Sequence, residues 1–179
     1  MASVTFKIVI CGDYAVGKTT LVKMFLDGNI LSGYKPTIGV DIGRKVIKID
    51  SQDITFQIWD LSGQESFKAI RKQFYARVDG GVLVFDVSRR ESYQNIIHWA
   101  EEMLEQTGNI PIILVGNKID LREKIDDSIK TDEGILLSRI ISKKTGLETP
   151  FIEASALQRQ NNLEPFIELG KLILTMHMP

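Results

Sequence analysis

The hydrophobic positions of this chain follow two spacings that alternate along its length. Apolar or alternating runs typical of strands occupy 4–10, 42–49, 53–60, 81–87, 110–116 and 151–155. Apolar residues at the three- and four-residue spacing of helices occupy 17–27, 65–77, 91–106, 131–145 and 161–176. Strands that alternate with helices in this way predict a doubly wound α/β fold with helices on both faces of the sheet.

The hydrophobicity of these strand-like runs and the residues between them predict how the strands are arranged. The runs at 82–85 and 110–115 are continuously apolar, as expected for central strands that are covered on both faces. Ser51 and Gln52 separate two neighbouring runs and indicate a hairpin. We therefore expect a mostly parallel, six-stranded sheet with one antiparallel edge strand. No repeat or linker divides the chain, so one domain over 1–179 is expected.

Composition narrows the classes of partner. The chain has 179 residues, of which 44% are hydrophobic and 25% are charged, and its formal net charge is -1. A near-neutral chain argues against nucleic acid as the main partner, because that binding favours a basic excess. Cys11 is the only cysteine, so no intrachain disulfide can form, and a reducing compartment is expected. We interpret Cys11 as a small buried hydrophobe.

The sequence carries no pattern typical of a membrane anchor. No apolar run approaches the roughly 18 residues that a spanning helix needs. Residues 1–4 match neither a signal peptide nor a myristoylation site, and 175–179 contain no cysteine for prenylation. We expect a cytoplasmic monomer that reaches a membrane only if a missing C-terminal tail or a partner supplies the attachment.

The segment between the first strand and the first helix carries the strongest chemical signal. Gly12-Asp13-Tyr14-Ala15-Val16-Gly17-Lys18-Thr19 matches the phosphate-binding pattern G-x-x-x-x-G-K-S/T in its strand–loop–helix context. The glycines let successive N–H groups face one anion, and the helix N-terminus adds a partial positive charge. Lys18 supplies a full charge, and the Thr19 hydroxyl can bind Mg²⁺. An ordinary glycine turn before a helix is the alternative.

A carboxylate ends the third predicted strand. Asp60 precedes Leu61-Ser62-Gly63-Gln64, and its place beside the glycine loop suits Mg²⁺, directly or through water. Gly63 offers a backbone N–H to a terminal phosphate. Gln64 can orient an attacking water, because its amide both donates and accepts hydrogen bonds. The alternative for Asp60 is a carboxylate that caps the following helix.

Two further loops indicate which base is bound. Asn117-Lys118-Ile119-Asp120 follows the fifth strand, and Asp120 can accept the two adjacent N–H groups that guanine presents and adenine lacks. Asn117 can brace the loop, and the Lys118 stem can cover a ring face. In Ser155-Ala156-Leu157, after the last strand, the Ala156 N–H can reach the guanine carbonyl. These loops all follow the carboxyl ends of strands, where such sheets bind ligands.

Together these motifs resemble those of the Ras superfamily of small GTPases, from about residue 6 to 174. Lys35-Pro36-Thr37-Ile38-Gly39-Val40-Asp41, Trp59-Asp60 and Gly63-Gln64-Glu65 with Phe74-Tyr75 are most similar to the Rab branch. The resemblance implies a switch in membrane traffic or related signalling that binds GTP with Mg²⁺ and hydrolyses it to GDP and phosphate. It also implies that effectors, an exchange factor and a GTPase-activating protein bind through residues 30–42 and 59–76. The implied effector surface contains Ile42, Trp59 and Phe74.

The expected site combines three groups of residues. Catalysis is assigned to Lys18, Thr37, Gly63 and Gln64, and the metal to Thr19, Thr37 and Asp60. The nucleotide is expected to contact Asp13, Tyr14, Ala15, Val16, Gly17, Lys18, Thr19, Thr20, Ile30, Tyr34, Thr37, Gly63, Asn117, Lys118, Asp120, Ser155, Ala156 and Leu157. No arginine is evident in the appropriate loop, and Arg89-Arg90 are interpreted as a solvated face, so an activating protein is expected to be needed.

Tyr14 and Ile30 depart from the family pattern. Tyr14 stands where relatives usually have a small residue near the γ-phosphate, so slow hydrolysis is expected unless the ring points to solvent. Ile30 stands where relatives usually pack an aromatic on guanine. Its loss removes about 1 kcal/mol and predicts faster nucleotide release, unless Tyr34 takes this role. Ile42 also replaces an aromatic and alters the implied effector surface.

Two other functions remain open at this point. A GTP-binding interaction module with negligible turnover is favoured by Tyr14. Another phosphate-binding enzyme, such as a nucleotide kinase or an ATPase, is disfavoured by the guanine-selective segment 117–120.

Overall fold

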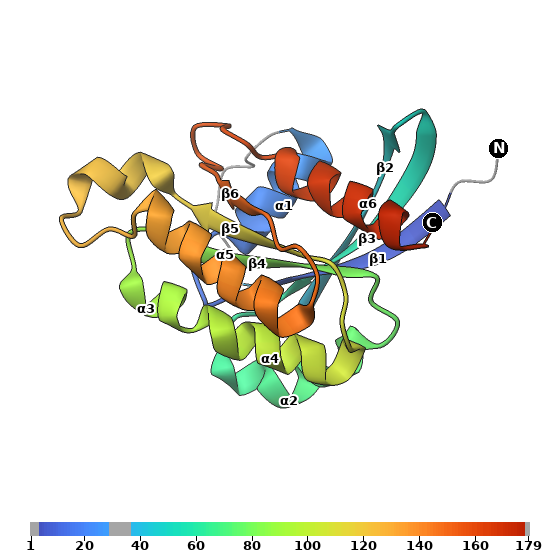
Figure 1. Ribbon diagram of the computed structural model, residues 1–179, viewed down its shortest axis with the longest axis horizontal. Helices are drawn as coiled ribbons and strands as arrows, with labels where there is room; N and C mark the ends of the chain where they lie inside the picture. The colour runs from blue at the N-terminus through green and yellow to red at the C-terminus, as the bar shows by residue number, and fades with distance from the viewer. Residues whose placement is uncertain (1–3, 29–36, 178–179) are drawn as a thin grey trace.

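The computed structural model describes residues 4–28 and 37–177 and has a six-stranded sheet at its centre (Figure 1). The strands are β1 Val4–Cys11, β2 Val40–Ile49, β3 Gln52–Leu61, β4 Gly80–Asp86, β5 Ile112–Asn117 and β6 Phe151–Glu153. Their order across the sheet is β2-β3-β1-β4-β5-β6. Only β2 runs antiparallel to its neighbour, which confirms the predicted mostly parallel sheet with one antiparallel edge strand.

Helices cover both faces of this sheet. The longer helices are α1 Lys18–Asp27, α4 Ile96–Thr107, α5 Thr131–Thr145 and α6 Glu164–His177. The shorter ones are η1 Glu65–Phe67, α2 Lys68–Arg71, η2 Lys72–Tyr75, α3 Arg90–Gln94 and η3 Ile119–Lys124. On one face, α1 and α6 cover the sheet, while α4 and α5 cover the other (Figure 1). Within the described residues, no helix combines the length and apolar character needed to cross a bilayer.

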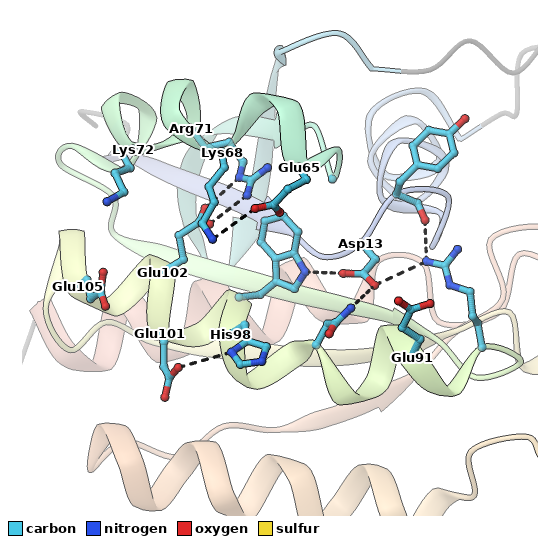
Figure 2. A pocket seen from close by; sticks show the side chains of 15 residues that line it. Asp13, Glu65, Lys68, Arg71, Lys72, Glu91, His98, Glu101, Glu102 and Glu105 are labelled. Carbon is cyan, nitrogen blue, oxygen red and sulfur yellow. Dashed lines mark hydrogen bonds and ion pairs between the residues drawn. The ribbon is translucent and has the colours of Figure 1, made fainter.

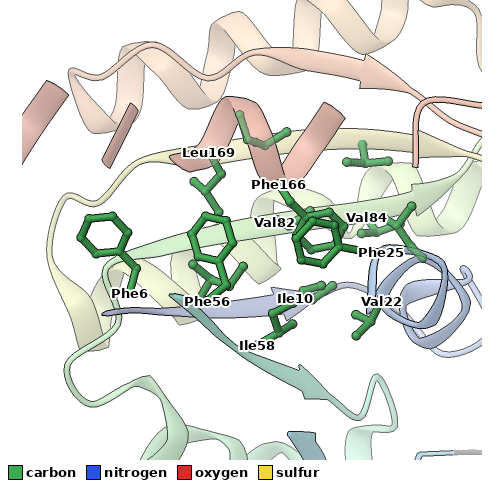
Figure 3. Packing of buried hydrophobic residues seen from close by; sticks show 14 of the residues in the cluster. Phe6, Ile10, Val22, Phe25, Phe56, Ile58, Val82, Val84, Phe166 and Leu169 are labelled. Carbon is green, nitrogen blue, oxygen red and sulfur yellow. The ribbon is translucent and has the colours of Figure 1, made fainter. Parts of the chain in front are cut away.

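The two hydrophobic clusters explain this layering. Beneath α1 and α6, the rings of Phe25 and Phe166 stack with their centroids 4.0 Å apart, above the apolar side chains of the central strands (Figure 3). Beneath α4 and α5, Trp99, Met103 and Ile141 pack against the opposite face. Burial on both faces accounts for the continuously apolar β4 and β5. Cys11 is buried in the second cluster, as predicted.

Three predicted boundaries were wrong. The hairpin turns at Asp50 and Ser51, whose φ angles of 48° and 70° suit a two-residue connection, so Ile49 pairs with Gln52. The predicted helix at 91–106 is interrupted at Asn95 between α3 and α4. The predicted helix at 65–77 ends at Tyr75 and is divided into η1, α2 and η2, and here Arg71 and Tyr75 are buried while Ile70 is 44% exposed. The apolar positions of segment 65–77 therefore did not predict which side chains are buried.

The sheet topology brings the candidate motifs to one edge. The parallel strands β1, β3, β4, β5 and β6 all end at this edge. Most of the expected site residues lie at the ends of β1, β3, β5 and β6 or directly after them, while Thr37 precedes β2. The register places Ile10 opposite Asp60 and Asp86 opposite Asn117, so the loops begin at similar heights.

Candidate nucleotide-binding site

In the loop between β1 and α1, every backbone carbonyl from Gly12 to Gly17 accepts a hydrogen bond. The Lys18 ammonium donates to the carbonyls of Gly12 and Asp13, both at 2.7 Å. The other donors are Arg89 Nη2 to Tyr14 at 2.6 Å, Lys118 Nζ to Ala15 at 2.7 Å, Asn117 Nδ2 to Val16 at 2.9 Å and Leu21 N–H to Gly17 at 2.9 Å. The carbonyls of Tyr14, Ala15 and Val16 are held by residues of neighbouring loops. Because the N–H and C=O of a peptide point in opposite directions, the N–H groups of these three peptides point away from those residues, an arrangement that suits anion binding.

The two glycines of the loop occupy positions that no other residue would fit. Gly12 has a φ of +144°, and a Cβ there would lie 2.1 Å from the carbonyl oxygen of Val84. Gly17 has a φ of +98°, and a Cβ there would lie 2.3 Å from Nδ2 of Asn117. Both positions combine a left-handed backbone with close contact, so the motif's glycines are explained by the packing around them.

Lys18 is a buried charge that lies against this loop. Burial lowers the pKa of Lys18 to about 8, while the nearby carboxylates of Asp60 and Asp13 oppose the shift. A cation that has lost its hydration is stabilised by any anion brought close to it. The site is therefore electrostatically suited to phosphate groups.

Three oxygen-bearing side chains gather beside Lys18. The hydroxyl oxygens of Thr19 and Thr37 lie 2.7 Å apart, and both hydroxyls donate to Oδ2 of Asp60. Asp60 is only 2% exposed, and its Oδ1 has no hydrogen-bond partner among the residues that the structure describes. Burial raises the pKa of Asp60, an effect that the Thr19 hydrogen bond and Lys18 reduce. Hard oxygen ligands around an orphaned carboxylate oxygen fit Mg²⁺, which keeps several ligands from water and phosphate.

Gly63 lies directly against the phosphate-binding loop. A Cβ at Gly63 would lie 2.4 Å from the backbone nitrogen of Tyr14 and 2.5 Å from the carbonyl oxygen of Gly12. Gln64 follows Gly63 and is partly buried. The structure thus places Gly63 beside the loop, with Gln64 next to it in the chain.

A cavity of about 330 Å³ adjoins the same loop. It is lined by Gly17, Thr20, Asn117, Lys118, Asp120, Leu121, Ala156 and Leu157. Asp120 Oδ1 accepts a hydrogen bond from Ser155 Oγ at 2.5 Å, so its carboxylate is held toward the last loop. Lys118 Nζ also lies 2.7 Å from Oδ2 of Asp86, which anchors its stem. The predicted base-binding residues therefore surround one cavity of their own.

Most of the predicted site residues meet at this edge of the sheet. Ile30 and Tyr34 lie outside the described residues, so their expected contacts stay predictions. The predicted effector residues also lie together. Ile42 is 55% exposed and pairs with Trp59 across the hairpin, and the rings of Trp59 and Phe74 are 5.6 Å apart.

Sequence reasoning missed several contacts to the loop. Arg89 does not lie on a merely solvated face: besides its bond to the Tyr14 carbonyl, it lies 4.0 Å from Asp13 Oδ2. Asp13 also accepts from Asn95 Nδ2 at 2.9 Å and from Trp99 Nε1 at 2.7 Å (Figure 2). These partners lie far from the glycine motif in sequence, and no local pattern marks them.

The fold and site agree with the comparisons to known proteins. The model of the Ras family matches residues 7–175. Ras-related protein Rab-15 of Homo sapiens and of Rattus norvegicus is 37% identical over 175 residues, which cover 97% of this chain and 79% of the relative. The Ras and EF-hand domain-containing protein homolog of Caenorhabditis elegans is 37% identical over 158 residues, or 88% of this chain, but this chain spans only 24% of that protein's length.

The chain therefore belongs to the Ras family of small GTPases, with similarity to its Rab branch. Members of this family bind GTP or GDP together with Mg²⁺, which is the chemistry that the Gly12–Gly17 loop, the cavity beside it and the oxygen cluster fit.

The base-binding cavity leads to a test of selectivity. Asp120→Ala should weaken binding of GDP by at least about 100-fold, because the paired N–H groups of guanine would lose a charged acceptor worth about 3 kcal/mol. Binding can be measured by competition with a fluorescent GDP analogue. The control is Asp126→Ala, which removes an exposed carboxylate outside the cavity. Equal GDP affinity in both variants would contradict the assigned role of Asp120.

Proposed function

We propose that this protein is a Rab-like switch that binds GTP with Mg²⁺, hydrolyses it to GDP and phosphate, and changes partners as it does so. The observation that carries this proposal is the loop whose carbonyls from Gly12 to Gly17 are all held by donors, beside a separate cavity that contains Asp120. Phosphate groups and a guanine base would occupy these two neighbouring sites.

The chain's own residues supply most of the proposed chemistry. Lys18 and the first N–H groups of α1 hold and neutralise the terminal phosphates. The Gln64 amide orients a water for in-line attack on the γ-phosphate, while Thr37 and the Gly63 N–H contact that phosphate. Mg²⁺, held by Thr19, Thr37 and Asp60, would neutralise charge on the phosphate oxygens.

Hydrolysis would then change the surface that partners meet. Loss of the γ-phosphate removes the contacts to Thr37 and Gly63, so the segments 30–42 and 59–76 relax. Effectors, an exchange factor and a GTPase-activating protein are proposed to bind there. The contiguous group of exposed Ile42 with half-buried Trp59 and Phe74 supports this location. We propose no nucleic-acid partner.

The cellular setting rests on the sequence and on similarity to Rab-15. We propose a cytoplasmic monomer with one GTP-binding domain over 1–179, active in membrane traffic or related signalling. These statements extend the family assignment to this chain.

The proposed reaction is tested by analysing the nucleotide bound to the purified protein and then following hydrolysis of loaded GTP over a single turnover. We expect guanine nucleotide and slow conversion of GTP to GDP. Gln64→Leu should slow conversion by at least about tenfold, because a water-orienting amide is lost, which corresponds to about 1.4 kcal/mol in the barrier. Bound adenine nucleotide would overturn the proposal, and GTP that stays intact in the wild type would favour a non-hydrolysing binding module.

That binding module is the second candidate because of Tyr14. Its side chain is 43% exposed and borders both the phosphate site and the cavity between α2 and α4, while its carbonyl is fixed by Arg89. Its backbone nitrogen lies next to Gly63, so the main chain of Tyr14 is close to the segment that contains Gln64.

We expect Tyr14→Gly to accelerate single-turnover hydrolysis roughly tenfold, a reduction of about 1.4 kcal/mol in the barrier, because the ring no longer restricts Gln64. The matched control is Tyr14→Phe, which keeps the ring and should retain the slow rate. The rates should be compared with and without a GTPase-activating protein. If the glycine variant hydrolyses GTP no faster under either condition, Tyr14 does not restrain the reaction.

A further inference from the structure

Arg71 is a buried arginine in the segment that follows Gln64. It is only 1% exposed, although it belongs to the short helix α2 near the protein surface. Its guanidinium makes a two-point contact with Glu102 of α4, with Nε–Oε1 at 2.9 Å and Nη2–Oε2 at 3.0 Å (Figure 2). Tyr75 donates a further hydrogen bond to Glu102 Oε1 at 2.9 Å. This bidentate pair holds the segment in one orientation against α4.

The remaining nitrogen of Arg71 binds the backbone beside the site. Nη1 donates to the carbonyl of Gln64 at 2.9 Å and to that of Ser62 at 3.2 Å. These two carbonyls flank Gly63, which lies against the phosphate-binding loop. Arg71 therefore contacts the main chain of Gln64, the residue proposed to orient water.

The other side of the guanidinium connects to the phosphate-binding loop. Arg71 lies over the ring of Trp99, 4.4 Å from its centroid, and Trp99 Nε1 donates to Asp13 at 2.7 Å. The position of Gln64 is thus tied to the loop through Arg71, Trp99 and Asp13. Arg71, Trp99, Asp13 and Glu102 all line a cavity of about 620 Å³ between α2 and α4.

The electrostatics are consistent with a persistent contact. Burial opposes ionisation of Glu102, but hydrogen bonds and charge from Arg71 outweigh it and keep the pKa of Glu102 below its usual value. Both partners therefore stay charged near neutral pH. A buried ion pair often adds little net stability over apolar packing, so its geometric effect is the more informative property.

We propose that Arg71 is a positioning residue for GTP hydrolysis, which clamps the Gln64 carbonyl to Glu102 and so fixes where the Gln64 amide meets the attacking water. This inference rests on the proposed GTPase function. Its distinctive consequence is that Arg71 acts through Gln64 and not through nucleotide binding.

Arg71→Met tests this role because methionine keeps an unbranched side chain over Trp99 and removes the hydrogen bonds. Single-turnover hydrolysis should slow by roughly tenfold or more, while the rate of GDP release should change by less than about twofold. In a Gln64→Leu background, Arg71→Met should cause no further loss, since the residue that Arg71 positions is already gone.

Arg71→Lys and Glu102→Gln provide variants that disturb folding less. Lysine keeps the charge but not the two-point contact, and we expect it to restore only part of the rate. Glu102→Gln should slow hydrolysis by an intermediate factor. If Arg71→Met is unfolded by circular dichroism, these two variants carry the same comparison with and without Gln64→Leu.

Three results would overturn the inference alone. These are hydrolysis by Arg71→Met at the wild-type rate, an equal loss in the Gln64→Leu background, or a loss that parallels faster GDP release. A wild-type protein that binds GTP and never hydrolyses it would instead overturn the proposed reaction, and the positioning role with it.

Discussion

A peptide group points its N–H and its C=O in opposite directions, and the site of this protein depends on that constraint. For the N–H groups between β1 and α1 to face one anion, the carbonyls of the same peptides must face away from it. A buried carbonyl without a donor costs about 1–3 kcal/mol, so each needs a partner. The loop from Gly12 to Gly17 has a donor for every carbonyl.

These donors link the phosphate site to the other functional parts. Asn117 and Lys118 hold the carbonyls of Val16 and Ala15, and the same two residues line the proposed base cavity. In the strand order β3-β1-β4-β5, the end of β1 lies between β3, which leads to Asp60, and β4, which leads to Arg89. The strand β5, which ends at Asn117, lies next to β4. Base recognition and phosphate binding therefore share their supporting hydrogen bonds.

The sequence predicted the parts of the site that lie within one short segment, and it missed contacts between residues that are distant in the chain. The segments Gly12–Thr19 and Asn117–Asp120 contain their own chemistry, and the alternating strands and helices placed them at one edge of the sheet. The contacts of Arg89 and Arg71 were missed because their partners are distant in sequence and because arginine side chains are usually exposed to solvent. The single helix expected at 65–77 is instead three consecutive short helices, and its buried side was missed for a related reason: Arg71 is buried beside Tyr75, while Ile70 is exposed.

The most direct test of this account is hydrogen–deuterium exchange at the backbone amides of residues 13–20, measured with Mg²⁺ and either GDP or ADP. GDP should slow exchange at these amides by at least about tenfold, because they bind its phosphates, whereas equimolar ADP should not. Equal protection by both nucleotides, or none with GDP, would contradict the claim that the carbonyl-braced loop is the phosphate site of a guanine-selective protein.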